Sequence, residues 1–203
     1  MLLIDRILKR INIQERGWVF CAKDFSDFSS RNNIDKMLSI LAFDKKIMRL
    51  ARGIYYFPEL NNKQKPLPPT KLMVAKAIAN NFNFKIFPSG QRALRMIGFP
   101  IKESDPNIFW TNAKTTKKRV GADQFIFKHK KIVPFAKTPE AIIVVLCAII
   151  EVGKDNIDEF LIKRCHSYLT KEERPHLLQM ASRVPVWVSM AISKILEFDN
   201  KNA

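Results

Sequence analysis

The feature that most constrains the fold of this chain is the order of hydrophobic patterns in its first 57 residues. Apolar residues at helical spacing alternate there with short β-prone runs. In chain order these patterns predict a helix over 4–11, a strand over 17–20, a short helix over 22–28, a helix over 31–43, and strands over 47–51 and 54–57. Arg52-Gly53 separates the last two runs, which predicts a tight hairpin turn. A helix, a short helix, a tight turn, an amphipathic helix and a basic hairpin predict a winged helix-turn-helix that binds double-stranded DNA.

The helix over 31–43 would enter the major groove in such a domain. Asn32, Lys36 and Ser39 lie opposite its apolar side, so we predict that they read base edges. Its first turn would take a phosphate, helped by the helix dipole, and Arg49 and Arg52 would follow the backbone or enter the minor groove. Alternatively, the polar side of this helix is only a solvated surface, and the two arginines are ordinary charges of a hairpin without a DNA contact. The predicted DNA-binding residues are Ser30, Arg31, Asn32, Asn33, Lys36, Ser39, Arg49, Arg52 and Tyr55.

Positive charge is concentrated in the middle of the chain. The total is +16, and residues 61–137 carry 16 Lys and Arg against 3 Asp and Glu, whereas residues 1–60 carry 11 against 7. This imbalance indicates a polyanionic partner. Six consecutive residues suit phosphate oxygens and predict a second nucleic-acid patch, with a solvated loop as the alternative. They are Lys114, Thr115, Thr116, Lys117, Lys118 and Arg119.

The predicted fold class is α+β with three parts. Residues 1–60 form the winged helix-turn-helix, residues 61–70 a proline-rich linker, and residues 71–203 a basic mixed α/β domain that ends in a helical bundle. Within the last part we expect helices over 71–81 and 89–97 and strands over 84–87, 107–111 and 124–128. The basic cluster is expected to be the turn between the last two strands. A helix should follow Thr138-Pro139, and further helices should begin near Asn156, Thr170 and Val184. Thr170 with Glu173, and Asn156 with Glu159, predict capping boxes.

Residue types that would support catalysis or a metal do not gather in this sequence. The three cysteines lack a C-x-x-C spacing and the histidines do not join them, so we expect no metal, no cofactor and no enzyme. Pro88-Ser89-Gly90 precedes a helix and could hold a phosphate, but it lacks a Walker lysine, so a plain helix cap is favoured. The aromatic residues between Phe82 and Phe127 are predicted to be buried in the core and not to form a platform on which single-stranded bases stack.

The location is expected to be the cytoplasm. The amino terminus lacks the pattern of an export signal, and the apolar run 141–150 is too short to span a membrane.

Several segments resemble a known family. GWVF, KDF, SSRNNIDKMLSIL, RLARGIYYFP and PLPP, in this order, are similar to the amino-terminal half of AbiE-type antitoxin regulators of bacterial type IV toxin–antitoxin systems. The resemblance implies that residues 31–39 are the recognition helix and 49–55 the wing. It also implies that the chain represses its own operon and counteracts a nucleotidyltransferase-like toxin without a stable complex.

Two departures from the family pattern concern the geometry of this domain. Cys21 stands at a helix cap where threonine or serine is expected, and Asp44-Lys45-Lys46 replaces a glycine-containing turn. We expect a weaker start of the short helix and an altered wing angle. An alternative function remains, in which the later part binds RNA and the winged helix is accessory.

Overall fold

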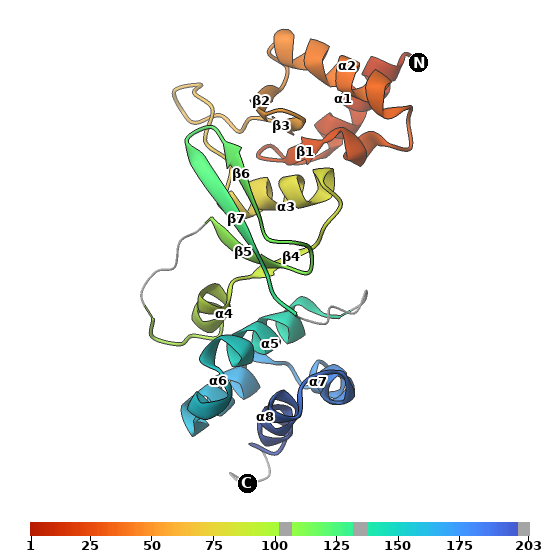
Figure 1. The fold of residues 1–203 in the computed structure, drawn as a ribbon. Helices are drawn as coiled ribbons and strands as arrows, with labels where there is room; N and C mark the ends of the chain where they lie inside the picture. Colours follow the sequence, from red (N-terminus) through yellow and green to blue (C-terminus); the bar gives the residue numbers. More distant parts are fainter. Residues whose placement is uncertain (102–106, 132–137, 199–203) are drawn as a thin grey trace. The chain divides into compact units, whose positions relative to one another are not determined.

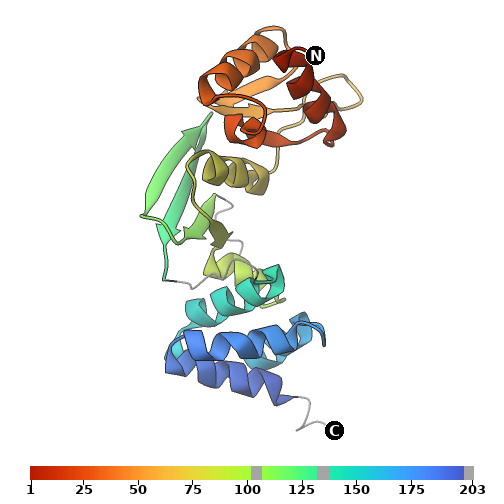
Figure 2. The same cartoon turned by 90° about the vertical axis from the view of Figure 1, so that its right-hand side faces the viewer.

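The chain folds into a mixed α+β structure. The computed structural model describes residues 1–101, 107–131 and 138–198 (Figures 1 and 2). Contacts divide it into two compact units: unit 1 is Met1–Lys85 with Lys117–Ile126, and unit 2 is Ile86–Thr116 with Phe127–Ala203. The three-part division at residues 61–70 stays a prediction from the sequence.

Unit 1 begins with six elements in the order expected from the hydrophobic patterns. They are α1 (Leu3–Ile13), β1 (Val19–Cys21), η1 (Ala22–Phe25), α2 (Arg31–Phe43), β2 (Met48–Ala51) and β3 (Ile54–Tyr56). The strands form an antiparallel sheet in the order β1-β3-β2. Gly53 closes the β2–β3 hairpin with φ +76°, a conformation that glycine adopts without a steric penalty, so the predicted tight turn is confirmed.

One apolar core holds these elements together. Ile7 and Ile11 of α1 meet Leu38 and Leu41 of α2 there, and all four side chains are fully buried. Because three or four residues separate the buried positions on each helix, one face is apolar and the opposite face is left in solvent. Burial of a leucine or isoleucine side chain contributes about 1.5–3 kcal/mol each, which holds α2 in this core.

The short helix predicted over 22–28 is wrong, and the start of α2 has no side-chain cap. The segment expected as a helix over 22–28 is only a 3-10 turn, η1, and Asp24 accepts the Cys21 N–H (2.8 Å) at its start. Ser30 is the N-cap residue of α2, but its hydroxyl forms no cap hydrogen bond. Backbone groups are therefore satisfied by a carboxylate at the first site and left to solvent at the second.

The end of α2 explains the unusual turn before the hairpin. The Lys45 N–H donates to Ala42 O (3.2 Å) and the Lys46 N–H to Leu41 O (3.0 Å), which is the Schellman pattern. Lys45 has φ +59°, in the left-handed region. The turn thus keeps the backbone shape for which glycine is favoured, although the residue is lysine.

Helix α3 (Lys71–Asn81) packs against β1, β3 and η1, so it belongs to unit 1. The Thr70 hydroxyl caps it by accepting from the Met73 N–H (3.3 Å). The preceding proline-rich segment is held to the hairpin strand, because the Tyr56 hydroxyl donates to Leu67 O (2.6 Å).

The second sheet has four strands, in the order β4-β5-β7-β6. Their bounds are β4 (Ile86–Pro88), β5 (Ile108–Thr111), β6 (Thr116–Val120) and β7 (Asp123–His129). The expected basic turn is wrong, because most of the cluster is β6, a strand at the edge of this sheet. Lysines on an edge strand discourage pairing with other chains, which gives these charges a structural role as well.

Unit 2 is completed by helices whose buried residues share one apolar core (Figure 2). The helices are α4 (Gly90–Met96), α5 (Glu140–Val152), η2 (Lys154–Asn156), α6 (Glu159–Tyr168), α7 (Arg174–Met180), η3 (Ala181–Arg183) and α8 (Val186–Leu196). Every side chain from Val144 to Ile149 is buried, so α5 is the centre of the core. Within the described ranges, no helix is both long and apolar enough to cross a membrane.

The predicted caps of the later helices are only partly right. Asp158, not Asn156, caps α6, by accepting from the Leu161 N–H (2.8 Å). Glu173 accepts from the Thr170 N–H (2.9 Å) as in a capping box, but α7 begins at Arg174 instead of near Thr170.

Candidate nucleic-acid interface

The outward side of α2 carries four exposed side chains in a row. Asn32, Lys36 and Ser39 are exposed, as the sequence predicts, and Phe43 continues the row at 86 % exposure. The spacing of four, three and four residues places them on one stripe, opposite the buried Leu41. The stripe offers an amide, an ammonium, a hydroxyl and an aromatic ring to a ligand.

One flank of α2 and the β2–β3 hairpin form the sides of a hollow of about 590 Å³. We call it the α2–hairpin groove. It is lined by Arg31, Asp35 and Ser39 from α2, by Arg49, Arg52, Gly53 and Tyr55 from the hairpin, and by Asn81 and Phe82 from the end of α3. Three guanidinium groups and one carboxylate thus face the same space, which suits an anion.

The three arginines of the groove differ in their contacts. Arg31 donates from Nε to Asp35 Oδ2 (2.8 Å) and from Nη2 to Asn81 Oδ1 (2.9 Å). Arg49 donates only a long bond to Ala51 O (3.4 Å), and Arg52 is exposed with no hydrogen bond or ion pair among the described residues. Arg49 and Arg52 are therefore available for a ligand, whereas Arg31 would have to exchange partners.

The remaining predicted residues on this side have smaller roles in the geometry. Asn33 donates to Ser29 Oγ (3.2 Å), next to the cap residue Ser30. Tyr55 is buried but lines the groove, and its hydroxyl oxygen lies 3.5 Å from Ser39 Oγ. Since the Ser39 hydroxyl also donates to Asp35 O (2.8 Å), a ligand would compete with that backbone bond.

Unit 1 carries a large excess of positive charge. Its residues include 19 Lys and Arg against 8 Asp and Glu, so unit 1 carries +11 of the total +16. The first 60 residues alone carry +4, and the difference comes from the loop before α3, from α3 itself and from β6. The field around the groove is consequently larger than the first 60 residues suggest.

The second predicted patch, residues 114–119, lies mostly on strand β6, where successive side chains point to opposite faces of the sheet. Lys117 and Arg119 are exposed and alternate with Lys118, whose Nζ lies 3.8 Å from the centre of the Phe82 ring. Lys114, Thr115 and Thr116 precede this part of the strand, and Thr115 Oγ1 accepts from the His129 N–H (3.0 Å). Thr116 to Arg119 therefore belong to a strand, whereas Lys114 and Thr115 lie before it.

The sequence reasoning missed Asn81, Phe82 and Asp35 as groove residues. Phe82 is 50 % exposed, whereas Phe109, Phe125 and Phe127 are buried, as expected for core. The only signal in the sequence is an aromatic ring within the polar run Asn80–Asn83 at the end of a helix.

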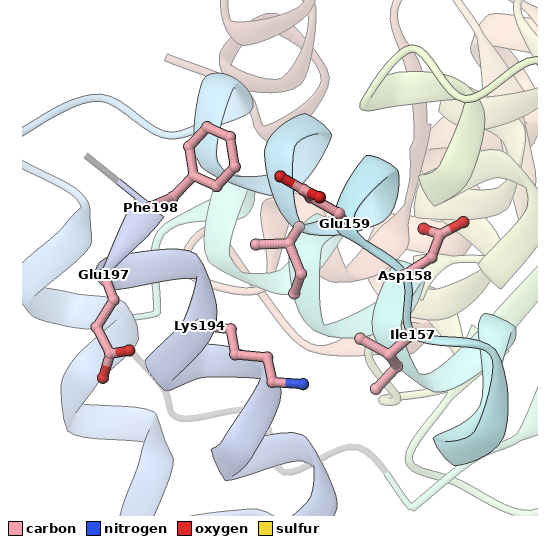
Figure 3. A pocket seen from close by; sticks show the side chains of 7 residues that line it. Ile157, Asp158, Glu159, Lys194, Glu197 and Phe198 are labelled. Atoms are coloured by element: carbon pink, nitrogen blue, oxygen red, sulfur yellow. The ribbon is translucent and has the colours of Figure 1, made fainter. Parts of the chain in front are cut away.

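A second hollow, of about 420 Å³, lies in unit 2 between the start of α6 and the end of α8 (Figure 3). Its floor is apolar, and charged side chains surround it; the lining residues are Ile157, Asp158, Glu159, Ile162, Lys194, Glu197 and Phe198. Asp158 is already used as the cap of α6. The other charged groups belong to exposed residues of both signs, so we assign no chemistry to this hollow.

A side chain of the protein, Glu151, lies against the helix start at Pro88-Ser89-Gly90. A Cβ on Gly90 would lie 2.3 Å from Glu151 Oε2, which places this carboxylate against the first turn of α4. Ser89 Oγ accepts from the Arg92 N–H (3.4 Å), so Ser89 acts as the cap that the sequence favoured. A phosphate would have to displace Glu151.

Cysteines and possible metal ligands are the remaining reactive groups. Burial raises the pKa of the Cys21 thiol to about 11 and that of the Cys165 thiol to about 12, so both are protonated at neutral pH. Within the described ranges, no three His, Cys, Asp or Glu side chains gather where they could hold a metal ion.

Comparison with known proteins gives a family for the chain. None of the curated proteins matches it. The model of a family of unknown function, DUF6088, matches residues 6–177, which is most of the 203 residues. The chain therefore belongs to the DUF6088 family.

Proposed function

We propose that residues 1–60 are a winged helix-turn-helix and that the protein binds double-stranded DNA through α2 and the β2–β3 hairpin. The element order α1-β1-η1-α2-β2-β3 and the sheet order β1-β3-β2 support this interpretation, because a winged helix places a hairpin beside the second helix of its helix-turn-helix. The observation that carries the proposal is the α2–hairpin groove, where an exposed helix and two available arginines face one space.

In this proposal α2 enters the major groove with its exposed stripe. Asn32 offers an amide that can pair with adenine, Lys36 an ammonium for guanine or phosphate, and Phe43 an apolar contact for a thymine methyl group. Arg49 and Arg52 follow the neighbouring backbone or enter the minor groove. The helix thereby selects sequence, and the hairpin adds affinity.

The biological role we propose is that of a bacterial antitoxin and repressor of its own operon, acting in the cytoplasm. This part rests on the resemblance of the amino-terminal segments to AbiE-type regulators. The chain would counteract a nucleotidyltransferase-like toxin through its later part, without a stable complex.

The DNA-binding proposal is tested with Asn32→Ala/Lys36→Ala in the full chain and a gel shift on the promoter fragment of its own operon. We expect binding to weaken by about 1–3 kcal/mol for each base-reading side chain that is removed, at about 150 mM salt. Lys9→Ala/Asn12→Ala is the matched control, because it also removes one lysine and one asparagine, and these exposed residues belong to α1 and not to the α2 stripe or the groove. Equal affinity of the wild type and Asn32→Ala/Lys36→Ala would remove α2 from recognition.

The antitoxin proposal is tested by co-expression with the neighbouring open reading frame. We expect the wild type and the Asn32→Ala/Lys36→Ala variant to restore growth equally, since repression and neutralisation use different surfaces. Absence of rescue by the wild type would refute this part and leave DNA binding standing. Tighter binding of tRNA than of any duplex would instead favour the RNA-binding alternative.

A further inference from the structure

We infer that the carboxyl end of α3 and the β6 strand are part of the DNA-binding surface, with Asn81, Phe82 and Lys118 contacting the backbone of the same duplex as the hairpin. This inference rests on the proposed function and extends the surface beyond residues 1–60. It concerns affinity for the sugar-phosphate backbone and not base recognition.

Three elements converge at one point of the α2–hairpin groove. A Cβ on Gly53 would lie 3.3 Å from Asn81 Nδ2 and 3.6 Å from Arg31 Nη2. The turn of the hairpin, the first residue of α2 and the last residue of α3 are therefore neighbours. A strand of DNA that follows Arg52 along the hairpin would meet the end of α3 next.

The end of α3 presents an unused donor at this point. Asn81 Oδ1 accepts the Arg31 guanidinium, and among the described residues its Nδ2 has no acceptor. An amide N–H close to Gly53, the residue after the exposed Arg52, suits the oxygens of a phosphate. Arg31 in turn neutralises the only carboxylate of the groove, that of Asp35, at 2.8 Å.

Phe82 and Lys118 continue the surface outward from the groove. Phe82 lines the groove with half of its side chain exposed, and Lys118 Nζ lies 3.8 Å from the centre of its ring. The ring holds the ammonium by a cation–π contact, which restricts the lysine at the rim. The ring would pack against a deoxyribose while Lys118 reaches the adjacent phosphate.

Polar bonds fix this end of α3 to the helix-turn-helix segment. Asn80 donates to Asp24 Oδ1 (2.8 Å), and Lys23 donates to Asn83 Oδ1 (2.8 Å). Together with the Arg31–Asn81 bond they join η1 and α2 to α3. Because these groups are ordered before binding, contacts from α3 cost little additional conformational entropy.

The test compares Lys118→Gln and Phe82→Ala in the full chain with the wild type, on operator and unrelated duplexes over a range of salt concentrations. We expect Lys118→Gln to reduce the slope of log K against log salt by about 0.9, the value for one phosphate contact. Phe82→Ala should weaken binding about 3–10-fold on both duplexes, which is the range of a modest apolar contact.

Matched controls are available in the same chain. Lys76→Gln removes an exposed lysine of α3 outside the groove, and Phe160→Ala removes a half-exposed ring whose cation, Arg164, lies 5.1 Å away in unit 2. Neither control should change the slope or the affinity. Thermal melting of each variant distinguishes a weakened interface from a misfolded protein.

The outcomes separate this inference from the proposed function. If Asn32→Ala/Lys36→Ala weakens binding while Lys118→Gln and Phe82→Ala bind like the wild type, the extended surface is refuted and the winged helix remains. If the wild type binds no duplex, both are refuted. Weaker binding of the operator alone by the two variants would also contradict a backbone role.

Discussion

Gly90→Ala should destabilise unit 2, because the first turn of α4 lies directly on α5. A Cβ at this position would be 2.3 Å from Glu151 Cβ and 2.3 Å from Glu151 Oε2. Carbon atoms in contact prefer about 3.5–4.0 Å, so the two helices would have to separate by more than about 1 Å. The carboxylate can rotate away, but the Cβ of Glu151 is fixed to the backbone of α5.

The expected magnitude follows from two opposing effects. Overpacking of a buried contact costs about 1–3 kcal/mol, and alanine in a helix recovers about 0.5–1 kcal/mol relative to glycine. Gly90 does not have a positive φ, so no backbone strain adds to the cost. We expect a net loss of about 1–2 kcal/mol in the free energy of unfolding.

Urea denaturation, followed by circular dichroism at constant m, measures this loss. A double-mutant cycle identifies the contact: Glu151→Ala should relieve the clash only partly, because its Cβ remains, and Glu151→Gly should relieve it further. Unchanged stability of Gly90→Ala, or complete relief by Glu151→Ala, would refute the steric explanation.

Three further predictions concern unit 1 and the buried thiols. Lys45→Gly should raise the free energy of unfolding by about 0.5–1 kcal/mol in thermal melts, because it removes a left-handed lysine from the end of α2; a lower melting temperature would contradict this. Burial raises the pKa of Cys21 to about 11 and of Cys165 to about 12. The folded state therefore keeps protons that the unfolded state loses above about pH 9, and stability should fall as pH rises from about 9 to 12; a flat profile in urea titrations would count against buried thiols. Arg10→Lys should destabilise the protein nearly as much as Arg10→Ala, about 1 kcal/mol, because only a guanidinium donates two 2.7 Å bonds to Asp27 while stacking 3.8 Å from the centre of the Phe28 ring. Full stability of Arg10→Lys in thermal melts would refute it.

Local patterns in the sequence determined the long helices of this protein. The bounds predicted for α2 and α3, 31–43 and 71–81, agree with the structure. Apolar spacing and flanking turn residues specify such helices because each residue interacts mainly with neighbours three or four positions away. The exposed stripe of α2 was predicted by the same reasoning, since the faces of a regular helix follow from its period.

Local sequence patterns did not correctly predict the short and highly charged elements. The run Lys114–Arg119 looked like a turn because it lacks apolar residues, yet residues 116–120 form an edge strand beside β7. Strand formation depends on the neighbouring strand more than on intrinsic preference. The cap of α6 moved from Asn156 to Asp158 for a related reason, because the packing of a helix decides where its first turn can begin.

The sequence by itself therefore determined an exposed polar helix followed by a basic hairpin, which is the basis of the proposed DNA-binding site. Only the tertiary structure brought Asn81 and Phe82, some 50 residues after Arg31, to the same groove, and Lys118 to the Phe82 ring. The physical reason is that α3 packs on β1 and β3 through its apolar residues, and those contacts, not its own end, fix where Asn81 lies. Such a position depends on long-range packing, which no local pattern encodes.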